Sequence, residues 1–194
     1  MANAVPEPPP DLKGRSLPLE QVAAGSVVYR VHATVRPPKF FGRSTRWRFD
    51  APDGSYGVLY SALAPEVAFA ETLLRGGHFV AFEEIEKRSL CEFRAIRTLR
   101  LVRLYGPSMV RIGASAGVTS GSDYAVSQHW SKAIYYHTEM VDGILYRATY
   151  DNDQLAAVLF DRAQDALDDG RSASFTSDLQ LLGRILDHYG ASTR

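Results

Sequence analysis

The sequence predicts an α+β fold, in which a mixed or antiparallel strand core carries inserted helices. Short runs rich in β-branched and aromatic residues recur along the chain, which is typical of strands. A smaller number of segments place apolar residues at the spacing of a helix, and one of them lies near the C-terminal end. This order, mostly strands with helices inserted and one at the end, favours the α+β class.

The N-terminal part of the chain is interpreted as a tail followed by one domain. Residues 1–16 crowd four prolines together and offer little to bury, so we expect a flexible Pro-rich segment. Residues 17–194 are long enough for a single domain with its own core. Its first strand is expected at residues 27–33, with Arg30 on the face opposite Tyr29.

A long irregular loop and a helix follow. Residues 36–56 are rich in Pro, Gly, basic and aromatic side chains and show no periodicity, and loops of that length and content are more often functional than decorative. A short buried strand is expected at 57–61. The next helix begins at Pro65, a residue favoured in the first turn, and ends at Gly76–Gly77.

The second half of the chain alternates strands with two helices. Strands at 79–82, 90–93 and 99–104 suggest an antiparallel run. A helix capped by Ser122 is expected at 122–137, and it is followed by strands at 144–149 and 155–160. The polar segment 161–174 is expected to be a loop, and 178–189 a final amphipathic helix.

Composition excludes several classes of protein. Lys and Arg together number 22, as do Asp and Glu, so no excess positive charge favours nucleic acid or anionic lipid. The single cysteine, Cys91, cannot form an internal disulfide and is interpreted as a small buried hydrophobe. Met1 to Pro10 lacks the features of a leader peptide, and no run reaches the length of a membrane span. We therefore expect a cytoplasmic protein that binds neither membranes nor nucleic acid directly.

Glu71 is the most informative single residue. The expected helix at 65–75 has an apolar stripe of Val67, Ala70 and Leu74, and Glu71 takes a position on the same stripe. A carboxylate there is costly unless it is paired or faces a pocket. Two interpretations stay open: Glu71 faces a functional cleft, or it forms an ion pair with Arg75 one helical turn later.

Other side chains suggest an anionic, aromatic ligand. The loop stretch Arg46-Trp47-Arg48-Phe49 combines guanidinium groups suited to phosphates with rings suited to stacking, although the rings could simply anchor the loop. Arg30, in the middle of a strand, is a further candidate. His129 and His137 are eight residues apart, which is too far for two ligands of one zinc ion, and the chain has no glycine-rich phosphate loop.

Four blocks of sequence identify a resemblance. They are Tyr29-Arg30-Val31, Arg48-Phe49-Asp50, Val58-Leu59-Tyr60-Ser61-Ala62 and Ala68-Phe69-Ala70-Glu71-Thr72. Together they resemble the RES domain, a family named for its Arg, Glu and Ser, over roughly residues 27–160. RES proteins are toxins of bacterial toxin–antitoxin pairs with Xre-type antitoxins, and their fold resembles that of ADP-ribosyltransferase toxins.

The resemblance implies an enzyme that consumes NAD as its substrate, needs no metal and is held by an Xre-type antitoxin. Members of the family deplete NAD by hydrolysis or phosphorolysis, or transfer ADP-ribose to an acceptor protein, which in at least one subgroup is phosphoribosyl pyrophosphate synthetase. Glu71 would then be the catalytic carboxylate that stabilises an oxocarbenium ion. Tyr60 would stack on the nicotinamide, and Arg30 and Arg48 would hold the pyrophosphate.

Two details of the resemblance leave alternatives open. The family arginine falls on Arg48, although Arg46 also fits the family's Arg-Trp form. The family serine is expected where this chain has Ala148, and either Thr149 or Ser127 could supply a hydroxyl instead. The departure leaves a catalytically silent nucleotide-binding module, or a protein-interaction module, as the alternative to an active enzyme.

Overall fold

The computed structural model describes residues 4–75 and 77–194. The strands are β1 (Leu19–Val22), β2 (Val27–Ala33), β3 (Val58–Ala62), β4 (Phe79–Val80), β5 (Arg88–Arg94), β6 (Leu99–Leu104), β7 (Gly143–Arg147), β8 (Leu155–Phe160), β9 (Arg171–Ser174) and β10 (Ser192–Thr193). The α-helices are α1 (Pro65–Leu73), α2 (Phe82–Glu86), α3 (Pro107–Ile112), α4 (Gly117–Ser120), α5 (Tyr124–Tyr135) and α6 (Leu179–His188). Short 3₁₀ turns are η1 (Leu12–Gly14), η2 (Asp161–Ala166) and η3 (Phe175–Ser177). Among the described residues, no helix is both long and apolar enough to cross a lipid bilayer.

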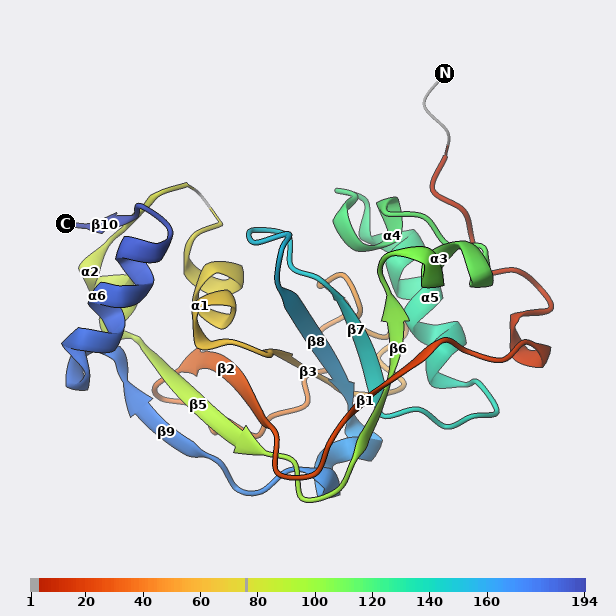
Figure 1. Cartoon of the computed structure of the whole chain (residues 1–194), viewed down its shortest axis with the longest axis horizontal. Coiled ribbons are helices and arrows are strands. Elements are labelled where there is room, and N and C mark those ends of the chain that lie inside the picture. Colours follow the sequence, from red (N-terminus) through yellow and green to blue (C-terminus); the bar gives the residue numbers. More distant parts are fainter. Residues whose placement is uncertain (1–3, 76) are drawn as a thin grey trace.

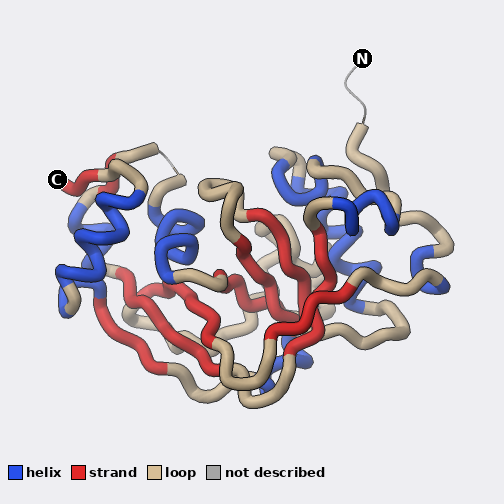
Figure 2. Tube along the Cα trace, in the orientation of Figure 1, coloured by secondary structure: helices blue, strands red, loops and turns tan. Residues whose placement is uncertain are grey.

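One large sheet organises the molecule. Its strand order is β1-β6-β7-β8-β3-β2-β5-β9, and every neighbouring pair is antiparallel except β6 and β7. Figure 1 shows β9, β5 and β2 on the left and β8, β7 and β6 on the right, with α1 above the middle of the sheet. Helix α6 lies at the left end and α3 to α5 at the right end, as the blue segments of Figure 2 also show. The predicted α+β class, a mixed and mostly antiparallel sheet with inserted helices, is confirmed.

Both faces of the sheet are buried. Successive residues of a strand point to opposite faces, and β3 divides accordingly: Val58 and Ala62 belong to the core that includes the helices, whereas Leu59 belongs to a second core. Residues of η2, among them Ala163 and Ala166, cover that second face. Cys91 lies fully buried in this second core, as the sequence predicts.

The predicted antiparallel run between residues 78 and 104 is wrong. Strand β4 pairs with β10, β5 lies between β2 and β9, and β6 lies between β1 and β7, so the three strands do not pair with one another. Phe82, expected in a strand, begins α2. Alternation of side chains indicates a strand but not its partner, and the partners here come from distant parts of the chain.

Other boundaries also differ from those expected. The helix expected at 122–137 begins later, because the side chain of Asp123 rather than Ser122 caps it by accepting the Ala125 N–H. Strand β9 lies inside the segment expected to be a loop, and β1 and α3 were not predicted. Helix α1 starts at Pro65 as predicted but ends at Leu73, short of the glycines.

Residues 4–16 differ from the expected tail. Leu12 is buried, Nε1 of Trp130 donates to the carbonyl of Pro6 at 2.8 Å, and Nε2 of His137 donates to the carbonyls of Leu12 and Arg15. Prolines keep their carbonyl oxygens as acceptors although they lose the N–H. The described part of this segment therefore packs against α5 instead of burying little.

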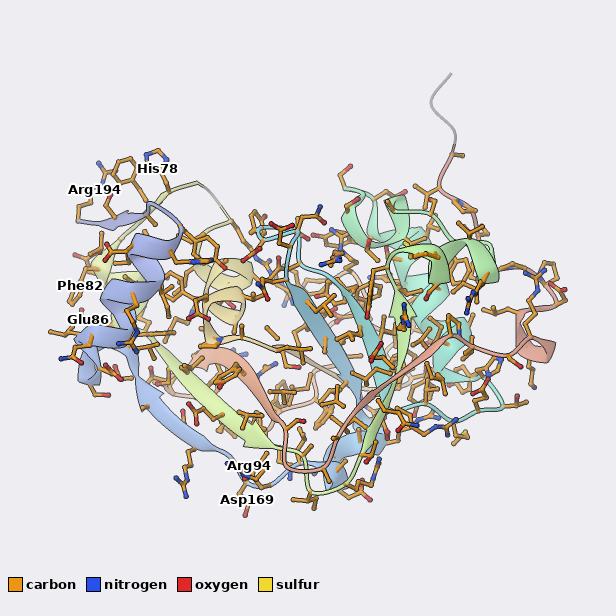
Figure 3. All side chains as sticks on the ribbon, in the orientation of Figure 1. His78, Phe82, Glu86, Arg94, Asp169 and Arg194 are labelled. Atoms are coloured by element: carbon orange, nitrogen blue, oxygen red, sulfur yellow. The ribbon has the colours of Figure 1, made fainter. Side chains whose placement is uncertain are left out.

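The C-terminal end of the chain forms a small parallel sheet. The amide of Ser192 donates to the His78 carbonyl at 2.9 Å, and the amide of Phe82 donates to the Arg194 carbonyl at 3.0 Å. Figure 3 shows His78, Phe82 and Arg194 gathered at this edge of the molecule. These bonds hold β10 against β4, next to α6.

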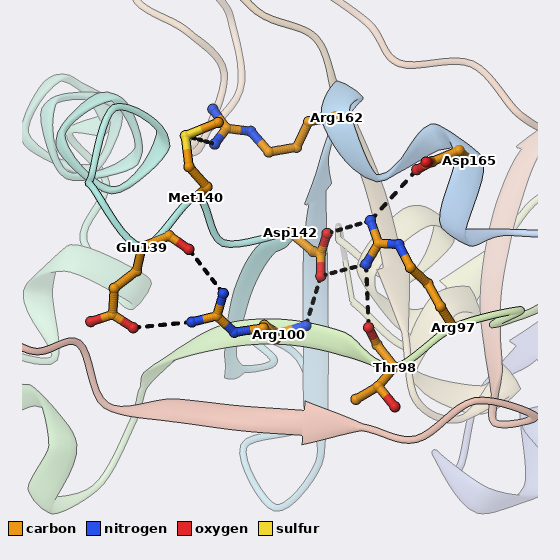
Figure 4. A network of polar contacts seen from close by, with 8 residues as sticks. All are labelled: Arg97, Thr98, Arg100, Glu139, Met140, Asp142, Arg162 and Asp165. Carbon is orange, nitrogen blue, oxygen red and sulfur yellow. Dashed lines mark hydrogen bonds and ion pairs between the residues drawn. The ribbon is translucent and has the colours of Figure 1, made fainter.

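A buried carboxylate ties β6 to β7, which are parallel and therefore not joined by a tight turn. Asp142 accepts two hydrogen bonds from Arg97, at 2.8 and 2.9 Å, and one from the Arg100 amide at 2.8 Å (Figure 4). The Asp142 side chain is only 7% exposed, whereas Arg97 is 44% exposed. Arg97 also reaches the exposed Asp165 at 3.5 Å.

Replacing Asp142 with Ala should lower the free energy of unfolding by about 1.5–3 kcal/mol, because a buried, charge-assisted hydrogen-bond set is lost. Asp165→Ala removes a solvent-exposed contact of the same arginine and should change stability by less than about 0.5 kcal/mol. Urea denaturation of both variants measures the difference. Equal losses for the two variants would contradict the assigned role of Asp142.

Candidate functional site

A pocket of about 220 Å³ opens between β2, β3 and α1. Its walls also include the loop before β3, the start of α5 and the turn between β7 and β8. The lining residues are Tyr29, Arg30, Val31, Trp47, Arg48, Tyr60, Ser61, Ala68, Glu71, Thr72, Arg75, Tyr124, Tyr146, Thr149 and Tyr150. All four site residues expected from the sequence, Arg30, Arg48, Tyr60 and Glu71, thus lie around one cavity.

The pocket lies where two neighbouring strands diverge. β2 pairs with β5 along its full length, but it pairs with β3 only between Tyr29 and Ala62. Beyond that pair, Nη1 of Arg30 donates to the Tyr60 carbonyl at 3.0 Å. The guanidinium of Arg30 therefore bridges the two strands across the opening.

Arg30 carries a poorly solvated positive charge. Its Nε is buried and has no hydrogen-bond partner among the described residues. Burial lowers the pKa of Arg30 to about 10, which still leaves it charged at neutral pH. A buried cation with a free N–H is costly without a partner, so this part of the pocket favours an anionic ligand.

A second buried carboxylate, Asp50, holds the loop before β3 in place. Its Oδ2 accepts the amides of Arg46 and Trp47, both at 3.1 Å, and the hydroxyl of Ser44. Its Oδ1 accepts the Tyr60 hydroxyl at 3.1 Å. Four donors from loop and strand converge on one side chain, so the loop is fixed against β3.

This arrangement turns Arg48 toward the pocket. Nη1 of Arg48 donates to the Gly121 carbonyl at 2.7 Å, and its guanidinium lies 4.7 Å from the centre of the Tyr124 ring. Arg46 is exposed, and its side chain does not belong to the described lining. Of the two alternative arginines, the structure brings Arg48 together with Arg30.

Tyr60 contributes its ring and not a free hydroxyl. The hydroxyl donates to Asp50 and accepts the Phe49 amide at 2.9 Å. Burial, with the Asp50 charge nearby, raises the pKa of Tyr60 well above its usual value, so it stays protonated. Tyr60 can therefore offer an aromatic surface to a ligand but cannot act as a base.

Glu71 projects from α1 toward the turn between β7 and β8. Its Oε1 accepts the backbone amides of Thr149 at 2.6 Å and Tyr150 at 3.0 Å. Arg75 donates from Nε to the backbone carbonyl of Glu71, and in the described part of the chain no ion pair joins the two side chains. The structure thus contradicts the ion-pair interpretation and supports the interpretation in which Glu71 faces a cleft.

The two hydroxyls considered in place of the family serine differ in location. Thr149 lines the pocket beside Glu71, next to the buried Ala148. Ser127 is fully buried, donates to the Val118 carbonyl at 2.6 Å and does not line the pocket. Ser127 therefore supports the junction of α4 and α5 in this structure.

Several residues of the site were missed by sequence reasoning. Tyr124, Tyr146 and Tyr150 complete the aromatic walls, and Asp50 fixes the loop. Asp50 was within reach of sequence analysis, because it ends the Arg48-Phe49-Asp50 block. Tyr124 and Tyr150 carried no such signal, since each belongs to an element that meets the pocket only after folding.

Cys91, His129 and His137 do not form a second site. Burial raises the pKa of the Cys91 thiol to about 11, which leaves it protonated and unreactive. His129 contacts Glu7, and His137 binds backbone carbonyls near the N-terminus. Across residues 4–75 and 77–194, no group of three His, Cys, Asp or Glu side chains is arranged to hold a metal ion.

Comparison with known proteins gives one family. The model of the RES domain matches residues 27–181. A curated relative, "Probable toxin y4kH" of Sinorhizobium fredii (strain NBRC 101917 / NGR234), is 24% identical over 115 residues, which are 59% of this chain and 90% of that protein.

A solved structure shares the fold. It is the crystal structure of the M. tuberculosis MbcT-MbcA toxin-antitoxin complex, which aligns with a TM-score of 0.64 and 16% sequence identity. The alignment covers 84% of this chain and 92% of the matched chain. At this identity the likeness establishes a common fold.

Proposed function

This chain belongs to the RES domain family, and we propose that it is the toxin of a bacterial toxin–antitoxin pair that cleaves the nicotinamide–ribose bond of NAD. The observation that supports this most is the content of a single pocket: a carboxylate held by two amides, three arginines and several aromatic rings. The names of the y4kH relative and of the MbcT-MbcA complex support the toxin role.

Glu71 is assigned to the chemical step. Cleavage breaks the carbon–nitrogen bond, and its electron pair leaves with nicotinamide, which departs as a neutral molecule because NAD carries it as a pyridinium. The ribose carbon then develops oxocarbenium character, as in glycoside hydrolysis. Thr149 and Tyr150 fix Oε1 of Glu71. Oε2 is left to face the positive charge, which stabilises the transition state more than the ground state.

The arginines and rings are assigned to binding. Arg30 and Arg48 would bind the pyrophosphate through charge-assisted hydrogen bonds. The Tyr60 ring, with its hydroxyl fixed on Asp50, would stack on the nicotinamide. Arg30 lines the pocket, where the pyrophosphate would balance its poorly solvated charge.

The acceptor of ADP-ribose is one of three classes: water, inorganic phosphate or a protein side chain. The pocket entrance carries Trp47 and Tyr150, which are 46% and 41% exposed. Exposed aromatic side chains suit contact with a protein, either an acceptor such as phosphoribosyl pyrophosphate synthetase or an Xre-type antitoxin.

A second candidate is a catalytically silent NAD-binding module. Ala148, where the family has serine, favours it because the side chain cannot donate a hydrogen bond. The two candidates differ in whether bound NAD is turned over.

Glu71→Gln should lower nicotinamide release at least about a hundredfold while NAD still binds, since it removes the charge and keeps an acceptor for the two amides. Glu66→Gln, on the same helix but outside the pocket, is the matched control and should keep the wild-type rate. Nicotinamide release and melting temperature are measured on the same preparations, with and without a candidate acceptor protein. A destabilised Glu71→Gln protein with wild-type specific activity would contradict the catalytic role of Glu71.

Arg48→Ala should weaken NAD binding roughly tenfold or more, because a charge-assisted hydrogen bond to pyrophosphate is lost. Arg46→Ala should bind normally, since that side chain lies outside the pocket. Isothermal titration in a Glu71→Gln background measures affinity without turnover of NAD. A loss for Arg46→Ala with none for Arg48→Ala would mean that the other arginine binds the ligand.

Expression of the chain alone should arrest bacterial growth, and co-expression with the neighbouring gene of an Xre-type antitoxin should restore it, because NAD consumption is toxic unless the pocket is covered. Glu71→Gln expressed alone should permit growth. Growth curves and cellular NAD content give the answer. Equal growth with and without the neighbour, while soluble active protein accumulates in both strains, speaks against a toxin.

A further inference from the structure

The turn between β7 and β8 holds the carboxylate of Glu71, and the same turn is held from its other side. Asp151 follows directly after Tyr150, and its Oδ2 accepts the hydroxyl of Tyr189 at 2.9 Å. The Asp151 side chain is only 12% exposed. In the described part of the chain, hydrogen bonds tie residues 148–154 to the two helical elements at Glu71 and Tyr189, and Arg147 at the end of β7 donates to the Asp153 carbonyl.

Tyr189 is itself well anchored. It caps the C-terminal end of α6, where its amide donates to the Ile185 carbonyl, and Leu182 and Ile185 bury that helix in the main core. Helix α6 packs against α1, the helix that carries Glu71. The Tyr189 hydroxyl is thus a fixed point from which the turn can be positioned relative to the carboxylate.

We propose that Tyr189 and Asp151 are positioning residues for Glu71. The hydrogen bond between them fixes the position of the turn between β7 and β8 relative to α1. This turn positions the amides of Thr149 and Tyr150, and these amides orient the carboxylate so that Oε2 points in one direction. The inference rests on the proposed function of Glu71, since orientation of its carboxylate matters only if Oε2 faces a reacting atom. A displacement of 1 Å at a reacting group can lower a rate about a hundredfold.

This support comes from outside the matched domain. The RES model ends at residue 181, and Tyr189 lies beyond it. The final helix therefore gives this chain a connection between its C-terminal region and the candidate catalytic carboxylate.

Tyr189→Phe removes only the hydroxyl. At saturating NAD it should lower nicotinamide release about tenfold, with the affinity for NAD within about twofold of wild type. The matched control is Tyr105→Phe, which also removes a hydroxyl from a carboxylate, that of Glu20 at 3.4 Å, but outside the pocket. Tyr105→Phe should keep the wild-type rate.

Further variants separate positioning from general destabilisation. Asp151→Ala should lower the rate at least as much, because it also removes the contact of Oδ2 with Nε2 of His188 at 3.8 Å. The double variant with Tyr189→Phe should be no slower than Asp151→Ala, because the bond between Tyr189 and Asp151 is already lost there. In a Glu71→Ala background, Tyr189→Phe should leave the residual rate unchanged. A loss of similar size in that background overturns the proposal.

Hydrogen exchange gives a measurement that does not depend on turnover. The amides of Thr149 and Tyr150 should exchange faster in Tyr189→Phe than in wild type, and at the wild-type rate in Tyr105→Phe. Unchanged exchange overturns the positioning role, and so does faster exchange with a wild-type rate of nicotinamide release. A wild-type protein that releases no nicotinamide, with or without an acceptor, contradicts the proposed function instead, and exchange alone then decides whether Tyr189 holds the turn.

Discussion

The sheet stays continuous between β2 and β3 through one residue pair, Tyr29 and Ala62, and the divergence beyond that pair makes room for the pocket. Strands that separate leave backbone carbonyls without partners, and an unpaired buried carbonyl is costly. At Tyr60 the guanidinium of Arg30 supplies the missing partner, because it donates a hydrogen bond to the backbone carbonyl. The residue that closes the gap in the sheet is therefore also a cation in the pocket, so the structural role and the proposed binding role share one side chain.

Four donors on Asp50 show how an irregular loop can serve as a rigid wall. The segment between β2 and β3 has few ladder hydrogen bonds of its own, and a loop of this length would sample many conformations if nothing held it. In place of strand pairing, the Asp50 carboxylate accepts hydrogen bonds from the amides of Arg46 and Trp47 and from the hydroxyls of Ser44 and Tyr60. The cost of burying this charge is offset by hydrogen bonds to all of these groups. The result is a loop whose position depends on β3, the strand that also supplies Tyr60.

The predictable part of the site was the part that is local in sequence. Tyr60 and Glu71 lie eleven residues apart on a strand and the helix that follows it, so their shared position on one cavity follows from local structure. The inward direction of Glu71 was visible in the helix stripe. What could not be predicted depends on long-range pairing: Glu71 meets Thr149, Arg48 meets Gly121, and the N-terminal segment meets Trp130. The same limit explains the wrong antiparallel run, because periodicity shows which residues are in strands and not which strands pair.

The geometry at Glu71 gives a physical context for Ala148. A serine side chain can donate one hydrogen bond, and replacing it with alanine removes that donor. The amides of Thr149 and Tyr150 belong to the backbone and persist whatever side chain stands at position 148, so the orientation of the carboxylate does not require a hydroxyl there. Backbone amides cannot accept or relay a proton, however, so they cannot activate a nucleophile. Under the proposed chemistry, the rate acceleration then has to come from stabilising the oxocarbenium ion. That ion is a strong electrophile, so a weak nucleophile can attack it without activation. In such a site the proposed catalysis depends on the orientation of the Glu71 carboxylate. The hydrogen bond between Asp151 and Tyr189 should therefore affect the rate more here than in a site that has its own hydroxyl.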